Sequence, residues 1–192
     1  ATLGTEPQVV TAAVDRLRAQ GERLQSVHVF HTISRQPALQ QARAHLEKAF
    51  SQPPYAGFLP YRSIPLGHDP DPDKQTQAEQ LSDIDTPQAG QIAFQTIYRH
   101  IRSLKRQGQR LHFCIAGGRK SLALFGMASA QLLFDENDRL WYLISSGDFL
   151  ESKRLHPLAS DQADLVPIPI ILWNQVSPAL TSLDQEDDPY AA

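Results

Sequence analysis

Short apolar runs alternate with longer helical patterns along this chain, and this alternation constrains the fold more than any other feature. Leu111 to Ala116 is the strongest strand candidate, Gly117-Gly118 ends it, and a helical pattern follows over 120–134. The start of the chain repeats this order, because Ala1 to Gly4 precedes a helical pattern that stops at Gly21. Strands that alternate with helices predict an α/β fold with a mostly parallel sheet and helices on both faces.

The remaining elements are predicted from the same patterns. Strands are expected over 27–31, 61–66, 140–144 and 165–172, and helices over 37–50 and 91–106. Pro65 argues against a central position for its strand, and Pro167 and Pro169 place the last strand at a sheet edge, because proline cannot donate to a ladder. Thr5 and Ser34 are expected to cap the first two helices.

Two stretches differ in composition from this core. Residues 67–87 combine acidic residues with alternating prolines, and they are predicted to be an exposed, solvated insertion with a short helix near 76–81. We expect residues 1–178 to form one domain and 179–192 to be an acidic tail or linker. Because the chain begins without methionine, in what looks like the second half of a strand, we expect it to be trimmed or part of a longer polypeptide.

Composition excludes several classes of function. The net charge of −3 provides no global positive field for duplex nucleic acid, although a local positive pocket for a small anion stays open. A single cysteine, Cys114, allows neither a disulfide framework nor a thiolate zinc cluster. No apolar stretch approaches the roughly 18 residues of a membrane span, and no signal peptide is visible. We expect a cytoplasmic protein without metal, cofactor, membrane partner or duplex nucleic acid.

Two turns between a strand and a helix have the composition of a binding site. They are Gly4-Thr5-Glu6-Pro7-Gln8 and Gly117-Gly118-Arg119-Lys120-Ser121. Ligands of α/β sheets bind where the strands end, and glycines there let the backbone approach the ligand. A helix N-terminus offers free N–H groups to an anion. Arg119 and Lys120 oppose the helix dipole, which favours an anion site over ordinary surface cations. The spacing is neither a Walker loop nor the dinucleotide fingerprint.

Three segments carry a resemblance to a known family: Leu3 to Val10, Phe30 to Thr32, and Ile115 to Ser121. They resemble CRISPR-associated Rossmann-fold (CARF) domains, in particular the NE0113-type group, and Leu143 to Phe149 with His156-Pro157 is similar as well. The resemblance implies a Rossmann-like fold, a homodimer, and a cyclic oligoadenylate bound on the dimer axis. It also implies that the ring can be cut, because some CARF proteins do so and thereby switch off an antiviral signal.

On this resemblance the expected ligand is cyclic tetra-adenylate, with the six-membered ring as an alternative. Lys120 would stabilise the charged transition state, Thr5 would position the attacking 2′-oxygen, and Arg119 would orient the phosphate. Other ligand contacts are expected from the remaining residues of both turns and from two strand ends: Gly4, Glu6, Gln8, Thr32, Gly117, Gly118, Ser121 and Ser146.

Several alternatives remain open from the sequence. His31 is a candidate general base, although a histidine at a strand end more often belongs to the core. Arg106 and His112 flank Gly108 and match the Arg…His pair of HEPN ribonuclease domains poorly, so no separate effector domain is expected. The resemblance to CARF proteins implies a metal-independent ring nuclease, which is the function we expect. The alternatives are a non-hydrolytic sensor domain of a larger effector nuclease, and a Rossmann protein that binds nucleotides or sugar phosphates.

Overall fold

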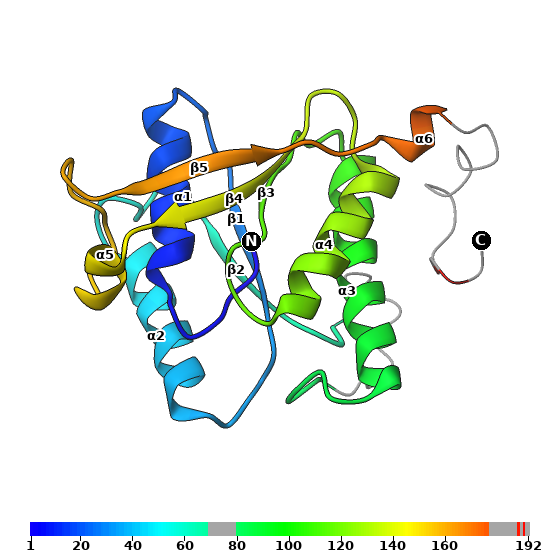
Figure 1. The fold of residues 1–192 in the computed structure, drawn as a ribbon, viewed down its shortest axis with the longest axis horizontal. Helices are drawn as coiled ribbons and strands as arrows, with labels where there is room; N and C mark the ends of the chain where they lie inside the picture. The colour runs from blue at the N-terminus through cyan, green and yellow to red at the C-terminus, as the bar shows by residue number, and fades with distance from the viewer. Residues whose placement is uncertain (69–79, 177–187, 189, 191–192) are drawn as a thin grey trace.

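Helices pack on both faces of a set of mostly parallel strands, as Figure 1 shows. The computed structural model describes residues 1–68, 80–176, 188 and 190. Over these residues the strands are β1 (Val27–His31), β2 (Tyr61–Pro65), β3 (His112–Cys114), β4 (Arg139–Ser145) and β5 (Ala163–Ile168). The helices are α1 (Gln8–Ala19), α2 (Pro37–Phe50), α3 (Pro87–Arg106), α4 (Lys120–Leu133), α5 (Gly147–Glu151) and α6 (Trp173–Val176). The predicted mixed α/β class is confirmed.

The strands form two ladders that the N-terminal segment joins. β1 pairs with β2 and β3 with β4, both in parallel, whereas β4 and β5 run antiparallel. Ala1–Leu3 lies between β1 and β3, because the Leu3 N–H donates to the Phe30 carbonyl at 2.9 Å and the Thr2 N–H to the Cys114 carbonyl at 3.2 Å. The order across the molecule is therefore β2, β1, the N-terminal segment, β3, β4 and β5.

Both outer strands contain the prolines that predicted an edge position. Within the described chain β2 pairs only with β1, and β5 pairs only with β4. Pro65 lies in β2, and Pro167 lies in β5 opposite Trp141, so the prediction from these prolines is confirmed. The last strand ends at Ile168 rather than near Leu172, and its antiparallel direction was not anticipated.

The two faces of the sheet are covered by different helices. Phe30 of β1 and Phe113 of β3 pack with α3 and α4 on one face. Their neighbours Val29 and Cys114 point to the opposite face, where α1 and α2 cover β1 and α1 covers β3. Because successive side chains of a strand alternate between faces, burial of both neighbours requires helices on each side. Cys114 is a buried free thiol, as predicted.

The N-cap residues of the first two helices differ from those expected. Pro7 occupies the N-cap position of α1, so Thr5 does not cap that helix. α2 begins at Pro37, as expected, but Gln36 is its N-cap residue, and Ser34 contributes only its Oγ as an acceptor for the Gln36 N–H at 3.3 Å. Both cap predictions were wrong, because each N-cap residue lies two positions after the predicted one.

Part of the predicted insertion over 67–87 belongs to the folded core. Leu81 is buried, its N–H donates to the Leu66 carbonyl, and its carbonyl accepts the N–H of Ile33. α3 begins at Pro87, not near residue 91, and Thr86 caps it by accepting the Ala89 N–H at 3.1 Å. The helix expected near 76–81 lies almost entirely outside the described residues, as does the tail over 179–192 apart from residues 188 and 190.

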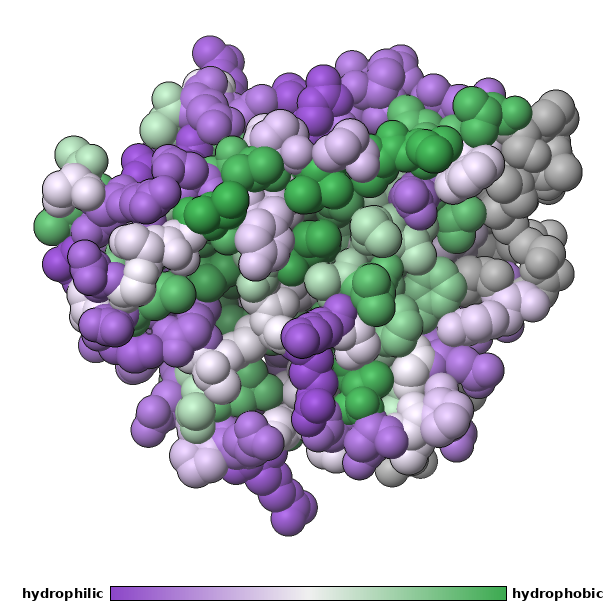
Figure 2. All heavy atoms as spheres, viewed as in Figure 1, coloured by the Kyte–Doolittle hydropathy of each residue, from purple (hydrophilic) through white to green (hydrophobic). Residues whose placement is uncertain are grey.

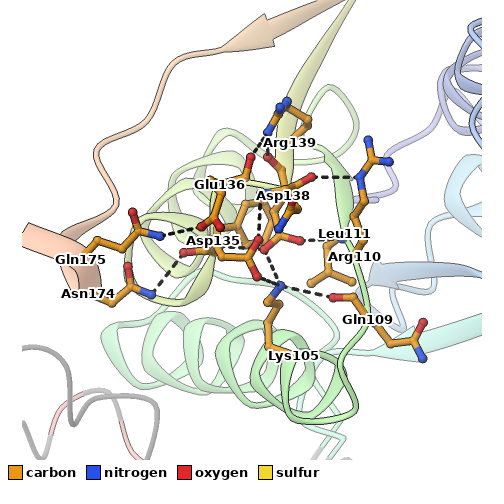
Figure 3. Close-up of polar contacts among 12 residues, drawn as sticks. Lys105, Gln109, Arg110, Leu111, Asp135, Glu136, Asp138, Arg139, Asn174 and Gln175 are labelled. Carbon is orange, nitrogen blue, oxygen red and sulfur yellow. Dashed lines mark hydrogen bonds and ion pairs between the residues drawn. The ribbon is translucent and has the colours of Figure 1, made fainter.

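A buried carboxylate anchors the turn between α4 and β4 (Figure 3). Asp138 accepts the N–H groups of Leu111 at 2.7 Å and Asp135 at 2.9 Å. The Lys105 ammonium, in the last turn of α3, lies 2.7 Å from both the Asp135 and the Asp138 carboxylates. These contacts tie the start of β4 to α3 and to the residue before β3.

A half-buried and a buried histidine link β1 to α3. His28 Nδ1 lies 2.7 Å from His100 Nε2, and the His100 ring packs edge-on against Phe30. Burial, together with nearby positive charges, lowers the pKa of His28 to about 4 and that of His100 to about 3. Both imidazoles are therefore neutral at pH 7.

Candidate functional site

The two glycine-containing turns predicted from the sequence pack against each other. A Cβ atom added to Gly4 would lie 2.7 Å from the Gly118 nitrogen, and one added to Gly117 would lie 2.2 Å from the Thr2 carbonyl oxygen. Gly118 has a φ of +86°, which side chains other than glycine rarely adopt. The Thr2 hydroxyl donates to the Gly117 carbonyl at 2.6 Å. Glycine is needed at these positions because the two backbones nearly touch.

A cavity of about 410 Å³ opens where these turns meet the end of β4. Its walls come from both turns, the last residues of β4, and single residues of α1 and α5: Gly4–Glu6, Val9, Ala116–Gly118, Tyr142–Ser145 and Leu150. This volume lies in the range of small-ligand pockets, about 300–1,000 Å³. Five of the predicted site residues, from two turns far apart in the sequence, therefore line one cavity.

Arg119 and Lys120 follow directly after the cavity wall. Arg119 is the N-cap residue of α4 and Lys120 is its first residue, and both side chains are exposed. The Arg119 guanidinium is ion-paired with the Asp83 carboxylate. Lys120 makes no hydrogen bond or ion pair with any residue that the structure describes. Ser121 is half-buried one position further on. The start of α4 thus presents one paired and one unpaired cation next to the cavity.

Glu6 contributes a carboxylate to the cavity wall, and this carboxylate is already engaged. Its two oxygens lie 2.7 and 2.8 Å from the Lys153 ammonium. The Gln8 side chain donates to Glu6 at 2.7 Å and to the Leu150 carbonyl at 3.1 Å. Gln8 is fully buried and does not line the cavity, so its observed role is to support the Glu6 side chain and α5.

Like Gln8, two further predicted contact residues lie outside the cavity wall. Thr32 is buried just after β1, and Ser146 is the N-cap residue of α5. The neighbouring Ser145 lines the cavity instead, together with Tyr142 and Ile144, which are 45% and 46% exposed. These three residues were not anticipated. The similarity of the segment beginning at Leu143 to the CARF family was the one sequence signal that pointed to this strand end.

His31 is part of the core. The ring is buried, with Nδ1 2.9 Å from the Thr32 carbonyl and Nε2 2.6 Å from the Ser63 hydroxyl. A carbonyl can only accept, so Nδ1 carries the proton and Nε2 accepts from Ser63. Burial lowers the pKa of His31. Both ring nitrogens are therefore occupied, and His31 does not line the cavity.

Neither a metal cluster nor a membrane-spanning helix is present among the described residues. No group of three or more histidine, cysteine, aspartate or glutamate side chains there could hold a metal ion. None of the helices over these residues combines the length and the apolar character that crossing a bilayer requires.

Comparison with known proteins gives one match that spans nearly the whole chain. The family described as CRISPR-associated protein NE0113 matches residues 6–191. This range includes the cavity residues from Glu6 onward and the whole second turn. No curated protein matches the chain.

Proposed function

Since the chain belongs to the CRISPR-associated protein NE0113 family, we propose that it binds a cyclic oligoadenylate, expected to be cyclic tetra-adenylate, between two copies of itself. The supporting observation is the contact of two glycine-containing turns around a cavity, with Arg119 and Lys120 beside it. A helix start with exposed cations and free N–H groups suits a phosphodiester anion. A CARF-type, Rossmann-like arrangement of the fold is part of the same proposal.

An exposed apolar strip beside the cavity supports a homodimer. The strip consists of Leu124, Tyr142, Ile144 and Val166, which are between 37% and 61% exposed. Tyr142 and Val166 are direct partners in the β4–β5 ladder, and Leu124 lies one turn after Lys120 on α4. Figure 2 shows apolar side chains over β4 and β5 that continue onto α4. A second copy on this strip would bring two cavities around one two-fold axis.

We further propose that the bound ring is cut without a metal ion. A ribose 2′-oxygen attacks the adjacent phosphorus, the bond from phosphorus to the 5′-oxygen breaks, and the proton of the 2′-hydroxyl passes through solvent to the leaving oxygen. The products carry a 2′,3′-cyclic phosphate and a 5′-hydroxyl. Lys120 stabilises the developing charge, Thr5 positions the 2′-oxygen, and Arg119 orients the phosphate. Because Glu6 is already paired with Lys153, we expect slow turnover.

A non-hydrolytic sensor of a larger effector nuclease is the second candidate. The observation that favours it is the lack of an unpaired base among the described wall residues: Glu6 is ion-paired, and His31 lies outside the wall with both ring nitrogens bonded. A sensor needs the cations and the cavity but not a proton acceptor.

Chromatography of tetra- and hexa-adenylate rings after incubation with the protein and a chelator tests these functions. We expect linear di-adenylate with a 2′,3′-cyclic phosphate from the tetra-adenylate ring. A bound ring that stays intact during long incubation with excess protein would establish the sensor. Tight binding of a mononucleotide, with no binding of either ring, would refute both and favour a nucleotide- or sugar-phosphate-binding protein.

Lys120→Ala tests the assignment of the cation. Charge-assisted contacts contribute about 1.5–3 kcal/mol, so we expect ring binding or cleavage to fall by about 10- to 100-fold. Lys48→Ala, at an exposed position of α2, is the matched control and should behave as wild type. Calorimetric titration and the chromatographic assay give the two readouts. If Lys120→Ala binds and cleaves the ring as wild type does, Lys120 is not part of the site.

A further inference from the structure

β4 runs past the end of its neighbour β3. The ladder between them stops at the pair Cys114 and Trp141, with one further hydrogen bond from the Ile115 N–H to the Trp141 carbonyl at 3.0 Å. The chain then leaves the sheet at Gly117 and Gly118, whereas β4 continues to Ser145 and pairs only with β5 there. The last residues of β4 therefore have a free edge on the side where β3 has ended.

The register decides which main-chain groups lie on that free edge. The Arg139 N–H donates to the Leu111 carbonyl and the Trp141 carbonyl accepts from Ile115, so odd-numbered residues of β4 direct their main-chain groups toward β3. The Ser146 N–H donates to the Gln162 carbonyl at 2.9 Å on the opposite side, as this alternation requires. The Leu143 carbonyl and the Ser145 N–H therefore point away from β5.

These two groups lie at the cavity. Leu143 and Ser145 both belong to its wall, and no main-chain partner is present for the Leu143 carbonyl or the Ser145 N–H among the residues that the structure places. In a parallel sheet, one residue of the neighbouring strand donates its N–H to the carbonyl of one residue and accepts the N–H of the residue two positions later. The Leu143 carbonyl and the Ser145 N–H form such a pair, and the cavity lies where that neighbouring residue would be.

An adenine base carries the complementary pair of groups. On its major-groove edge the N6 amino group donates and N7 accepts, whereas guanine presents two acceptors, O6 and N7, on the same edge. We propose that the free edge of β4 at Leu143 and Ser145 selects adenine in the cavity by this edge, an inference that rests on the ring binding proposed above. The Leu143 carbonyl accepts from the N6 amino group, and the Ser145 N–H donates to N7. A guanine that presents the same edge would oppose its O6 to the Leu143 carbonyl oxygen.

Burial strengthens this selection. The Leu143 side chain is 5% exposed, so the carbonyl belongs to a strand that packs closely against α1 and α5. A buried polar group left without its partner costs about 1–3 kcal/mol, and a base that fails to satisfy it is rejected accordingly. The glycine-containing turns and Lys120 contact phosphate in this arrangement, so affinity and base selection come from different parts of one site.

Binding of modified rings tests this inference separately from the proposed function. We expect the wild-type protein to bind cyclic tetra-adenylate at least about tenfold more tightly than cyclic tetra-guanylate or a ring of N6,N6-dimethyladenine, which has lost the N6 donor. Equal affinity for all three rings would overturn base selection and leave ring binding intact. No binding of any ring would overturn both.

Two substitutions at one position complete the test. Ser145→Pro removes the N–H without removing a ladder hydrogen bond to β5, and it should weaken cyclic tetra-adenylate binding by about tenfold or more. Ser145→Ala keeps the N–H and should therefore keep the preference for the adenine ring over the guanine ring, which Ser145→Pro should lose. Melting temperatures establish that each variant folds. If Ser145→Pro does not fold, the comparison of the three rings still tests whether the site selects adenine. If Ser145→Pro folds and binds cyclic tetra-adenylate as tightly as wild type, the inference is overturned.

Discussion

Arg119 and Asp83 form an ion pair at the start of α4, and in the proposed complex the Asp83 carboxylate would compete with the ligand phosphate for the guanidinium. The two side chains are 53% and 32% exposed, and exposed pairs contribute about 0–1 kcal/mol to stability. Asp83 also accepts the Ile84 N–H at 2.6 Å, so its carboxylate is held in place next to the turn. Of the two cations in the second turn, Arg119 is therefore already neutralised by the Asp83 carboxylate.

Asp83→Asn should therefore raise the affinity for cyclic tetra-adenylate about threefold and change the free energy of unfolding by less than about 1 kcal/mol. Asp85→Asn, in the same segment and exposed, is the matched control and should leave affinity unchanged. Calorimetric titration and urea unfolding measure the two quantities. Weaker binding by Asp83→Asn would instead show that Asp83 orients Arg119 for the ligand.

Glycines marked the positions in the sequence where the backbones of two turns come close together. Gly4, Gly117 and Gly118 line the cavity because tight turns and close backbone approach leave a mark in the sequence. Gln8 and Thr32 are in the expected segments, yet both are buried. Spacing along the chain does not tell on which side of a turn a side chain lies, because that depends on elements that pack there only in the folded protein, such as α5 against Gln8.

The turn after Ala1–Leu3 and the turn after β3 act as one structural unit. Their contact is between backbones, since the position of a Cβ on Gly117 would be 2.2 Å from the Thr2 carbonyl oxygen. A shift of either turn would therefore move the other, and the cavity between them would change shape. The position of the two cations depends on this contact because Gly118 directly precedes Arg119.

Gly117→Ala should destabilise the protein by more than about 1 kcal/mol and weaken ring binding, because the added methyl group forces the two turns apart. Gly90→Ala is the matched control. Gly90 lies within α3, where the nearest atom to an added Cβ is Phe125 Cζ at 3.7 Å. That substitution should stabilise by about 0.4–1 kcal/mol. Urea unfolding measures both, and a neutral Gly117→Ala would contradict the described contact.

Element types were predicted better than element ends or directions. The patterns over Val27–His31, Pro37–Phe50 and Lys120–Leu133 correspond to β1, α2 and α4, because apolar periodicity reports a face that is buried along the whole element. The five-residue α5 was missed, since so short a helix has no periodicity to detect. The direction of β5 was not predictable either, because it depends on how the chain returns after α5.

The whole molecule presents an apolar strip that a monomer would leave in water. Large exposed apolar patches mark interaction sites in soluble proteins. Leu124→Glu should convert a dimer to a monomer, because it places a charge within the strip without altering the cavity wall. Leu158→Glu, at a position that is 52% exposed outside the strip, is the matched control and should stay dimeric. Sedimentation velocity distinguishes these outcomes; a monomeric wild-type protein would contradict the proposed homodimer.

The stability of the whole molecule should depend on pH through the paired histidines His28 and His100. The pKa values of His28 and His100, about 4 and about 3, lie below the ordinary value of 6.5. Below pH 6.5 the unfolded chain therefore binds protons that the folded chain does not, and stability falls as the pH drops toward 4. We expect the free energy of unfolding, measured in urea, to decrease between pH 7 and pH 4.

His100→Gln should flatten this pH dependence, because the substituted side chain no longer takes up a proton on unfolding. His45→Gln replaces an exposed histidine of α2 and serves as the control, with the slope of wild type. An unchanged slope for His100→Gln would contradict the depressed pKa of that residue.

The prolines of the outer strands bear on how copies of this chain can associate. The Leu66 N–H donates to the His31 carbonyl, so even-numbered positions of β2 face β1, and Pro65 has its nitrogen on the open side. The same alternation in β5 directs the Pro167 nitrogen away from β4. Each rim of the sheet thus lacks a donor where an incoming strand would need one. Pairing of a strand from another copy with a sheet edge is a common first step of aggregation, and the prolines at both edges of this sheet disfavour it.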